Sequence, residues 1–256
     1  MITRRAMHFL ARLSAPVAFA MLLGPAPAAA EEEARLVQAA QTSAYEDLYA
    51  AMREGVDDTV MIENILDTMI AEIRRQAPEF ALLEEEEPQL MNNLRGNVRP
   101  VLMDYSERVR VAYLPEMIAV LQGGLTAAEA RDLAAFYRSE VGQKLLAGVS
   151  GSFTGEETMR GMGGDFDQQV DTEAVARDIR SASVKAYLTL TPEERQEVET
   201  VFAQNPALAK MNALQPRINA VRAAMENEAM TPEEEARMDA ALDDTFAPFS
   251  DDLPDE

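Results

Sequence analysis

Four adjacent residues, Phe136 to Ser139, combine side-chain types that suit recognition. Tyr137 offers an aromatic hydroxyl and Arg138 a guanidinium, and such a pair binds acidic or aromatic groups. On a helix the two side chains are about 100° apart, so Arg138 can lie at a rim while Tyr137 packs inward. Helix packing is the more ordinary explanation, with Phe136 and Tyr137 on one face and Ser139 as a cap. We therefore predict Phe136, Tyr137, Arg138 and Ser139 as binding residues and keep packing as the alternative.

Carboxylates are the main groups left for catalysis. The chain has no cysteine and a single histidine, His8, in a segment that we expect to be removed. Thiol nucleophiles, thiolate metal sites and Ser–His–Asp chemistry are then excluded. Two carboxylates suffice to cleave a glycan. The glutamates that recur at matching places, Glu129 and Glu194, already have an explanation as helix caps, so we expect no catalytic residue.

Two groups of residues have the types, but not the pattern, of metal ligands. Asp165, Asp167 and Asp171 suggest calcium, yet the glycine and the final glutamate of an EF-hand are missing at the required positions. Met159 and Met162 offer two thioethers to copper without a histidine or cysteine beside them. We expect no metal and no cofactor.

The first thirty residues have the pattern of a secretory signal peptide. Three arginines begin it, an apolar run follows from Leu13 to Leu23, and three alanines precede Glu31. The apolar run is too short to cross a bilayer, although a membrane anchor is the alternative. We predict cleavage after Ala30 and a periplasmic protein without a membrane span.

The net charge of the chain limits the classes of partner that it can bind. The formal net charge is −22, and removal of the signal, which holds three arginines and no acid, brings it to −25. A mature protein with this negative charge is repelled by nucleic-acid phosphates and by anionic lipid surfaces. We expect no nucleic acid as partner, and an unidentified envelope protein or small ligand instead.

The composition and periodicity predict an all-α fold. The chain contains 42 alanines, and aromatic residues make up 6% of it, which favours helices over strands. The periodicity of residues 173–188 predicts that the side chains of Val175, Ile179 and Val184 point toward the core. Apolar spacing and caps predict helices over 33–53, 58–76, 100–121 with a kink near Pro115, 125–138, 139–149, 173–188, 190–204, 206–229 with a kink or break at Pro216, and from 231 onward.

Two stretches 65 residues apart share one pattern. In residues 125–149, Thr126 and Glu129 have the spacing of a capping box, and in residues 190–214 so do Thr191 and Glu194. In both, apolar residues and a second cap follow at matching places. The pattern predicts two copies of a capped helix–turn–helix unit, with a chance likeness of amphipathic helices as the alternative.

The copies suggest a bundle of two lobes. Glycines gather between them, which favours a connecting loop or hinge. The predicted parts are a signal peptide over 1–30, an N-terminal lobe over 31–150, a glycine-rich connection over 151–172, a C-terminal lobe over 173–248 and an acidic, disordered tail over 249–256.

Residues 113–149 resemble the exported bacterial family called domain of unknown function 2059. Leu125-Thr126 and Glu129 carry this resemblance, together with the string Phe136-Tyr137-Arg138-Ser139 and the string Gly142-Gln143-Lys144-Leu145-Leu146. It implies a helical fold and an exported protein, but no activity, cofactor or catalytic residue.

Two functions of different classes follow from the sequence. The first is a non-enzymatic binding or interaction protein of the envelope. The second is a glutamate-dependent hydrolase or lyase that acts on envelope glycans. A cleft with a buried, unpaired glutamate would favour the second.

Overall fold

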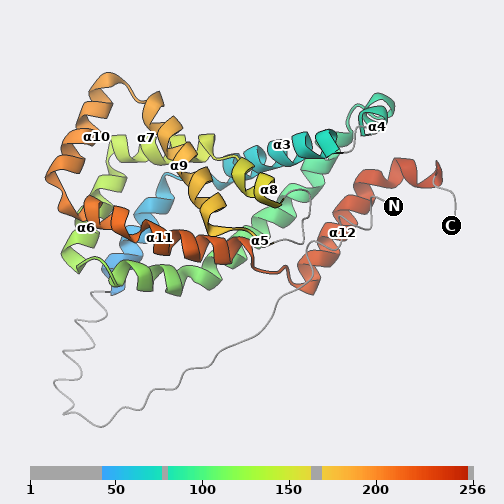
Figure 1. Ribbon diagram of the computed structural model, residues 1–256. Coiled ribbons are helices and arrows are strands. Elements are labelled where there is room, and N and C mark those ends of the chain that lie inside the picture. The colour runs from blue at the N-terminus through green and yellow to red at the C-terminus, as the bar shows by residue number, and fades with distance from the viewer. Residues whose placement is uncertain (1–41, 77–79, 163–168, 253–256) are drawn as a thin grey trace, which may run out of the picture.

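The computed structural model describes residues 42–76, 80–162 and 169–252, and every regular element among them is a helix (Figure 1). The all-α prediction is confirmed. The predicted signal peptide, Asp165, Asp167, the side chain of Met162 and the end of the acidic tail lie outside the described residues. The helices are one over residues 42–54, α3 (Asp58–Gln76), α4 (Phe80–Glu86), α5 (Leu90–Gln122), α6 (Ala127–Arg138), α7 (Glu140–Ser152), α8 (Glu156–Met162), α9 (Thr172–Thr189), α10 (Pro192–Gln204), α11 (Pro206–Glu226), α12 (Pro232–Phe246) and the 3-10 helix η2 (Ala247–Asp252).

The 33-residue helix α5 extends from one group of helices to the other. We expected it to begin near residue 100, because proline inside a helix removes one backbone hydrogen bond. It begins at Leu90 instead and continues through Gly96, Pro100 and Pro115. Its first turns bury Leu90, Leu94 and other apolar side chains, and this burial outweighs the local cost. Helix α11 likewise continues through Pro216, so the proline does not divide the helix, and the predicted alternative of a kink stays a prediction.

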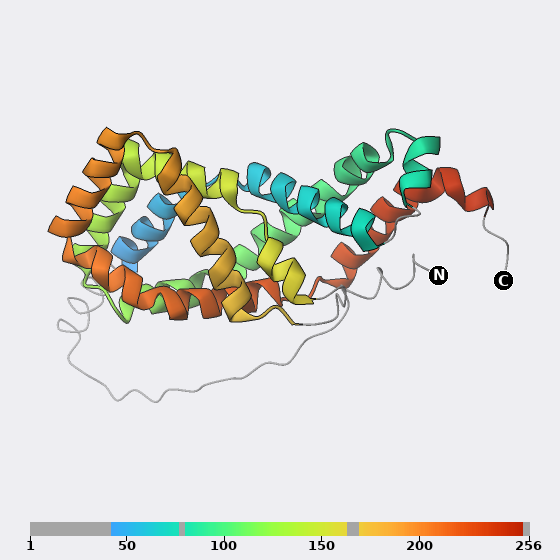
Figure 2. The same ribbon diagram turned by 45° about the horizontal axis from the view of Figure 1, so that its top comes forward.

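Two hydrophobic clusters pack against the two halves of α5. The larger one unites the second half of α5 with helix 42–54, α6, the start of α7, α10 and α11. The smaller one unites the first half with α3 and α12. Figure 2 shows these two groups of helices at opposite ends of the molecule. Each cluster takes residues from both sides of the glycine-rich stretch, so the clusters do not coincide with the predicted lobes, whose boundaries stay a prediction.

A polar clamp joins α5 to α12 and to the end of α11. Arg108 donates to both carboxylate oxygens of Glu234, at 2.8 and 2.9 Å. Glu234 is 7% exposed, and the hydrogen bonds from Arg108 lower the pKa of its carboxyl. Tyr105 donates to the Glu228 carbonyl at 2.6 Å. These contacts fix the turn between α11 and α12 against α5.

Helices α7 and α9 pack closely because small residues face each other. A Cβ atom on Gly148 would lie 2.9 Å from the Cβ atom of Ala186. The inner face of α9 consists of Ala174, Val175, Asp178, Ala182 and Ala186. Val184 is 53% exposed, so its predicted inward orientation is wrong. Because the backbones of α7 and α9 lie close together, α9 presents alanines to α7. The periodicity had predicted larger side chains on this face.

The predicted glycine-rich connection contains the short helix α8, which the sequence did not predict. Asp178 of α9 accepts hydrogen bonds from the backbone amides of Glu157 and Thr158, both at 2.9 Å. It also accepts from the Thr158 hydroxyl at 2.7 Å. Asp178 is 4% exposed, so its carboxylate is fully used in capping α8.

The predicted caps form. Thr126 and Thr191 begin α6 and α10 with complete capping boxes, in which Glu129 and Glu194 are the returning carboxylates. Lys210 donates to Glu129 at 2.6 Å, and this bond is the main reason why the pKa of Glu129 falls to about 2. The two stretches bend at Ser139 and at Asn205. Their descent from one repeated unit, and the equality of their paths, stay predictions.

We predict that Thr126→Ala and Thr191→Ala each lower the free energy of unfolding by about 1 kcal/mol, because each removes an N-cap acceptor. Denaturant melts of the two variants measure this. Thr200→Ala is the control, because Thr200 is exposed inside α10, where alanine is the better helix former. Unchanged midpoints for both cap variants would contradict the assignment.

Candidate functional site

The four predicted binding residues lie at the junction of α6 and α7, where two of them have structural roles. Phe136 is 8% exposed and belongs to the larger hydrophobic cluster. Its ring lies 5.4 Å from that of Tyr137 and 6.3 Å from that of Phe202. Ser139 accepts from the Gly142 amide at 3.1 Å and so caps α7. A Cβ atom on Gly142 would lie 2.1 Å from the Phe136 carbonyl oxygen, so this bend requires glycine.

Arg138 points outward and ties α6 to helix 42–54. Its guanidinium donates to both carboxylate oxygens of Asp47, at 2.9 and 2.8 Å, and to Glu54 at 2.8 Å. The hydrogen bonds from Arg138 hold the pKa values of Asp47 and Glu54 below their usual range. The guanidinium of Arg138, which we predicted to bind a ligand, is therefore already paired with two carboxylates of the protein.

Tyr137 points the other way, into the molecule. Its side chain is partly buried and packs against the larger cluster. Burial raises the pKa of its hydroxyl to about 12, and the positive charge of Arg222 partly opposes this rise. Tyr137 therefore lies near a set of polar side chains from helix 42–54 and α11.

This set, which we call the inner cluster, contains five residues from three helices. The charges that act on the Arg222 guanidinium come from Tyr49, Glu226, Arg53 and Tyr137. Tyr49 and Arg53 lie one turn apart on helix 42–54, and Arg222 and Glu226 lie one turn apart on α11. Glu226 is exposed to solvent and the other four are partly buried, so solvent reaches the cluster.

Arg222 is the unusual member of the inner cluster. Burial lowers the pKa of its guanidinium. It forms no ion pair and no side-chain hydrogen bond with any residue that the structure describes. Arg53, by contrast, is paired with Asp58. One turn before Arg222, the buried Oδ1 atom of Asn219 also lacks a hydrogen-bond partner within the described chain. This part of α11 thus presents a donor and an acceptor that the protein leaves unused.

Glu226 is a carboxylate with a shifted affinity for protons. Desolvation by the surrounding protein raises the pKa of its carboxyl, Arg222 opposes this, and Asp178 adds to it. No described residue forms an ion pair or a hydrogen bond with its side chain. A raised pKa is what a general acid requires. Asp178, the neighbouring carboxylate, is engaged by the amides of α8.

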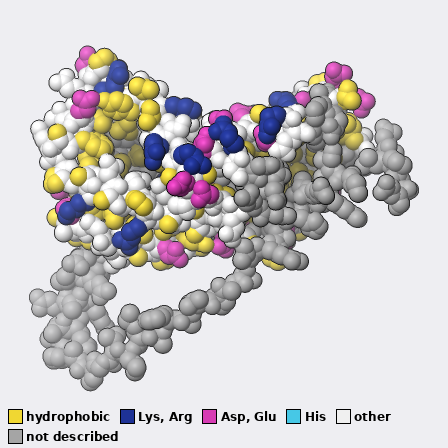
Figure 3. Space-filling view, viewed as in Figure 1, with side chains coloured by type: hydrophobic (Ala, Val, Ile, Leu, Met, Phe, Trp, Pro, Cys, Tyr) yellow, Lys and Arg dark blue, Asp and Glu magenta, His cyan; other side chains and the backbone are white. Residues whose placement is uncertain are grey.

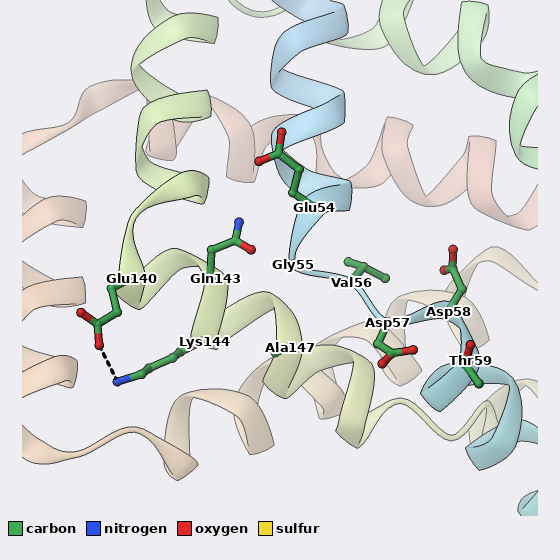
Figure 4. Close-up of a pocket in the computed structure, with 10 residues that line it drawn as sticks. All are labelled: Glu54, Gly55, Val56, Asp57, Asp58, Thr59, Glu140, Gln143, Lys144 and Ala147. Carbon is green, nitrogen blue, oxygen red and sulfur yellow. Dashed lines mark ion pairs between the residues drawn. The ribbon is translucent and has the colours of Figure 1, made fainter.

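A separate, open hollow of about 690 Å³ lies between the end of helix 42–54 and α7 (Figure 4). Four acidic residues line it, and each has a partner. Glu54 pairs with Arg138, Asp58 with Arg53, and Glu140 with Lys144 at 3.1 Å. Asp57 accepts from the Val60 amide at 3.1 Å. The acids of the hollow therefore stabilise helix ends and junctions.

Some apolar side chains of α9 and α10 face solvent. Val184, Leu188 and Phe202 are 53%, 61% and 45% exposed. Figure 3 shows hydrophobic side chains gathered over the part of the surface where these helices lie. Phe202 holds the place that Tyr137 holds in the first stretch, but unlike Tyr137 it is exposed.

The described residues give no support to the metal alternatives. No group of three or more His, Cys, Asp or Glu side chains in the described ranges has the arrangement of a metal site. Asp171 precedes α9 without a side-chain capping bond. Met159 is partly buried. The absence of a metal from the protein stays a prediction.

The fold and the site define an all-α protein with two packing clusters and a polar group of side chains beside the larger one. Residues 114–148, from the end of α5 to α7, match the model of a bacterial family described as "Uncharacterized protein conserved in bacteria (DUF2059)". The match confirms the resemblance seen in the sequence. No curated protein and no solved structure matches the chain.

No single helix in the described ranges is long and apolar enough to cross a membrane. Helices α5 and α6 meet the criteria of length and composition only when taken together, with a bend of 116° between them. Apart from Val109, the buried residues of both helices belong to the hydrophobic clusters.

The sequence pointed to Tyr137 and missed its neighbours. Arg222 and Glu226 are the residues that the pattern of α11 could have indicated. Arg222 stands four residues after the buried Ile218, so a charge occupies a position on the apolar face of an amphipathic helix. Tyr49 and Arg53 carry no such signal, because both fit an ordinary helix surface.

We predict that Arg138→Ala lowers the denaturation midpoint slightly at neutral pH and not in acid. The folded-state pKa values of Asp47 and Glu54 are lowered, so their stabilisation by Arg138 is present above the unfolded-state values of about 4 and is lost as the pH falls below them. Midpoints measured across this range for the wild type and the variant test this.

The matched control is Arg131→Ala, because Arg131 is an exposed arginine of the same helix. A difference between the wild type and Arg138→Ala that does not change with pH would contradict the assignment.

Proposed function

We propose that this protein is exported to the periplasm and there binds a small ligand at the inner cluster without breaking bonds. The export part rests on the sequence of residues 1–30, with cleavage after Ala30. The binding part rests on one observation, the partly buried Arg222 that no described residue pairs with.

An unpaired charge in a desolvated place costs free energy, because the lost hydration is not replaced. Within the described ranges, the other arginines with partly buried side chains form ion pairs, except Arg195. Most of the partly buried arginines thus form an ion pair with a carboxylate, whereas Arg222 forms none within the described ranges. A ligand that brings an acceptor to Arg222 would offset this cost and would gain affinity from it.

The negative charge of the mature chain argues against nucleic acid as the ligand. An envelope protein is the other partner that the sequence suggested. The exposed apolar side chains of α9 and α10 are the surface that such a partner would contact.

The binding proposal predicts a bound small molecule in protein purified from the periplasm. Native mass spectrometry of the mature wild type is expected to show added mass that is lost on denaturation, and Arg222→Met is expected to lack it. Arg217→Met is the matched control, because Arg217 is an exposed arginine of the same helix. Equal added mass in the wild type and Arg222→Met would contradict binding at the inner cluster.

A second candidate, a glutamate-dependent hydrolase or lyase acting on envelope glycans, has one observation in its favour. Glu226 has a raised pKa and no described partner. The chemistry needs a second carboxylate, and Asp178 is committed to α8.

We therefore expect purified mature protein to release no soluble product from peptidoglycan, and we expect Glu226→Gln to behave identically. Turnover by the wild type that disappears in Glu226→Gln would establish the hydrolase or lyase and overturn the binding proposal. Glu199→Gln, a change at an exposed glutamate of α10, is the control for general effects of lost charge.

A further inference from the structure

We infer that the outer surface of α9 and α10 is the interface of a symmetric dimer, in which α9 of each copy packs against α10 of the other. We call this surface the α9–α10 face, and its apolar side chains are Val184, Leu188 and Phe202. Three features support the dimer: the apolar centre of the face, the separation of its charges, and the way in which the first stretch covers the matching surface. The dimer does not depend on ligand binding at the inner cluster.

The centre of the α9–α10 face is apolar. Val184 and Leu188 lie one turn apart on α9 and are 53% and 61% exposed, and Phe202 of α10 is 45% exposed. Helices α9 and α10 meet at an angle (Figures 1 and 2), and hydrophobic side chains gather between them (Figure 3). Exposed apolar side chains that gather in this way mark a contact surface.

The exposed side of α9 is basic. Arg180 and Lys185 are exposed, and neither forms an ion pair with a residue in the described ranges. The other exposed charged residues of this helix, Glu173 and Arg177, pair with each other at 3.6 Å. Arg180 lies one turn before Val184 and therefore borders the apolar centre. A chain with a net charge of −22 thus places two positive charges without a described partner beside an apolar area.

The exposed side of α10 is acidic. Its exposed charged residues are Glu193, Glu197 and Glu199. None of the three forms an ion pair with a residue that the structure describes. Glu199 accepts a hydrogen bond from the Tyr187 hydroxyl at 2.6 Å, but this donor is neutral and does not compensate the negative charge. Positive and negative charge therefore lie on two different helices of one face.

This arrangement is self-complementary under a two-fold rotation. A two-fold axis along the bisector of the angle between α9 and α10 turns a second copy face to face with the first and lays its α10 over α9. The bases of α9 then meet the acids of the other copy's α10, and the two apolar centres meet each other. Packing α9 on α9 would bring like charges together, so the charges favour the crossed pairing. At about 0.15 M salt, repulsion between the two acidic proteins is screened beyond about 8 Å, whereas charges in contact still interact.

The matching surface of the first stretch is already covered by a helix. There Arg138 of α6 forms ion pairs with helix 42–54, and Tyr137 is partly buried. Phe202 and Ala203 of α10 stand at the corresponding places of the second stretch, and both are exposed. A helix of a second copy therefore has an open surface to cover on α10, as helix 42–54 covers α6.

Two charge-reversed proteins test the crossed pairing. Arg180→Glu/Lys185→Glu makes both sides of the face acidic, and Glu197→Lys/Glu199→Lys makes both sides basic. We expect the mature wild type to dimerise in sedimentation velocity runs between about 1 and 300 μM at about 0.15 M salt. Each reversed protein alone is expected to stay monomeric, because like charges meet. Their equimolar mixture is expected to form a heterodimer, because each acidic helix then meets a basic one.

The matched control is Arg131→Glu/Arg217→Glu, which reverses two exposed arginines of α6 and α11 and is expected to dimerise like the wild type. Single changes at exposed apolar residues give a second measurement. Leu188→Ser is expected to raise the dissociation constant of the dimer at least about tenfold, because the dimer loses this buried side chain twice. Val111→Ser, at a residue of α5 that is 57% exposed, is expected to leave it unchanged.

A wild type that stays monomeric over this concentration range would overturn the dimer, and capture of another envelope protein by the same face would not restore it. A dimer that Leu188→Ser and both reversed proteins retain would overturn the α9–α10 face as its interface. A mixture of the reversed proteins that stays monomeric would overturn the crossed pairing. Because association and ligand binding are measured separately, each of these results leaves the proposed binding at the inner cluster unaffected.

Discussion

The burial of both halves of one long helix is the constraint on which the rest of this structure depends. Helix α5 offers apolar side chains along its whole length, and neither half can be left in water. Segments from distant parts of the chain therefore cover it, with α3 and α12 at one end and helix 42–54, α6 and α11 at the other. Two prolines inside α5 do not prevent this, because the packing of a helix face contributes more than the local preference of single residues.

The same constraint creates the inner cluster. Helix 42–54, α6 and α11 must all reach the larger hydrophobic cluster, and their flanking polar side chains are then brought together. Most of the charges gathered in this way find partners, as Arg138 does with Asp47 and Glu54. Arg222 and Glu226 do not, within the described chain. The unpaired Arg222 of this group is the observation on which the proposed binding function rests.

The candidate site shows how far a local motif can be interpreted. The string Phe136 to Ser139 was a reasonable binding prediction, because it combines an aromatic hydroxyl with a guanidinium. In the structure Phe136 packs in the core and Ser139 caps α7, while Arg138 forms ion pairs with carboxylates of helix 42–54. Only Tyr137 takes part in the inner cluster. The other members lie at least 84 positions away along the chain, and no local pattern relates them.

The sequence by itself determined the all-α class and the beginnings of the capped helices α6 and α10. Capping boxes at Thr126 and Thr191 form among residues three positions apart, so short-range chemistry is enough to specify them. Only the tertiary structure decided which helices share a core, why α9 presents alanines to α7, and which distant side chains act on the charge of Arg222. These outcomes depend on how closely backbones approach and on which carboxylates lie within reach, and both are set by contacts between segments distant in the chain.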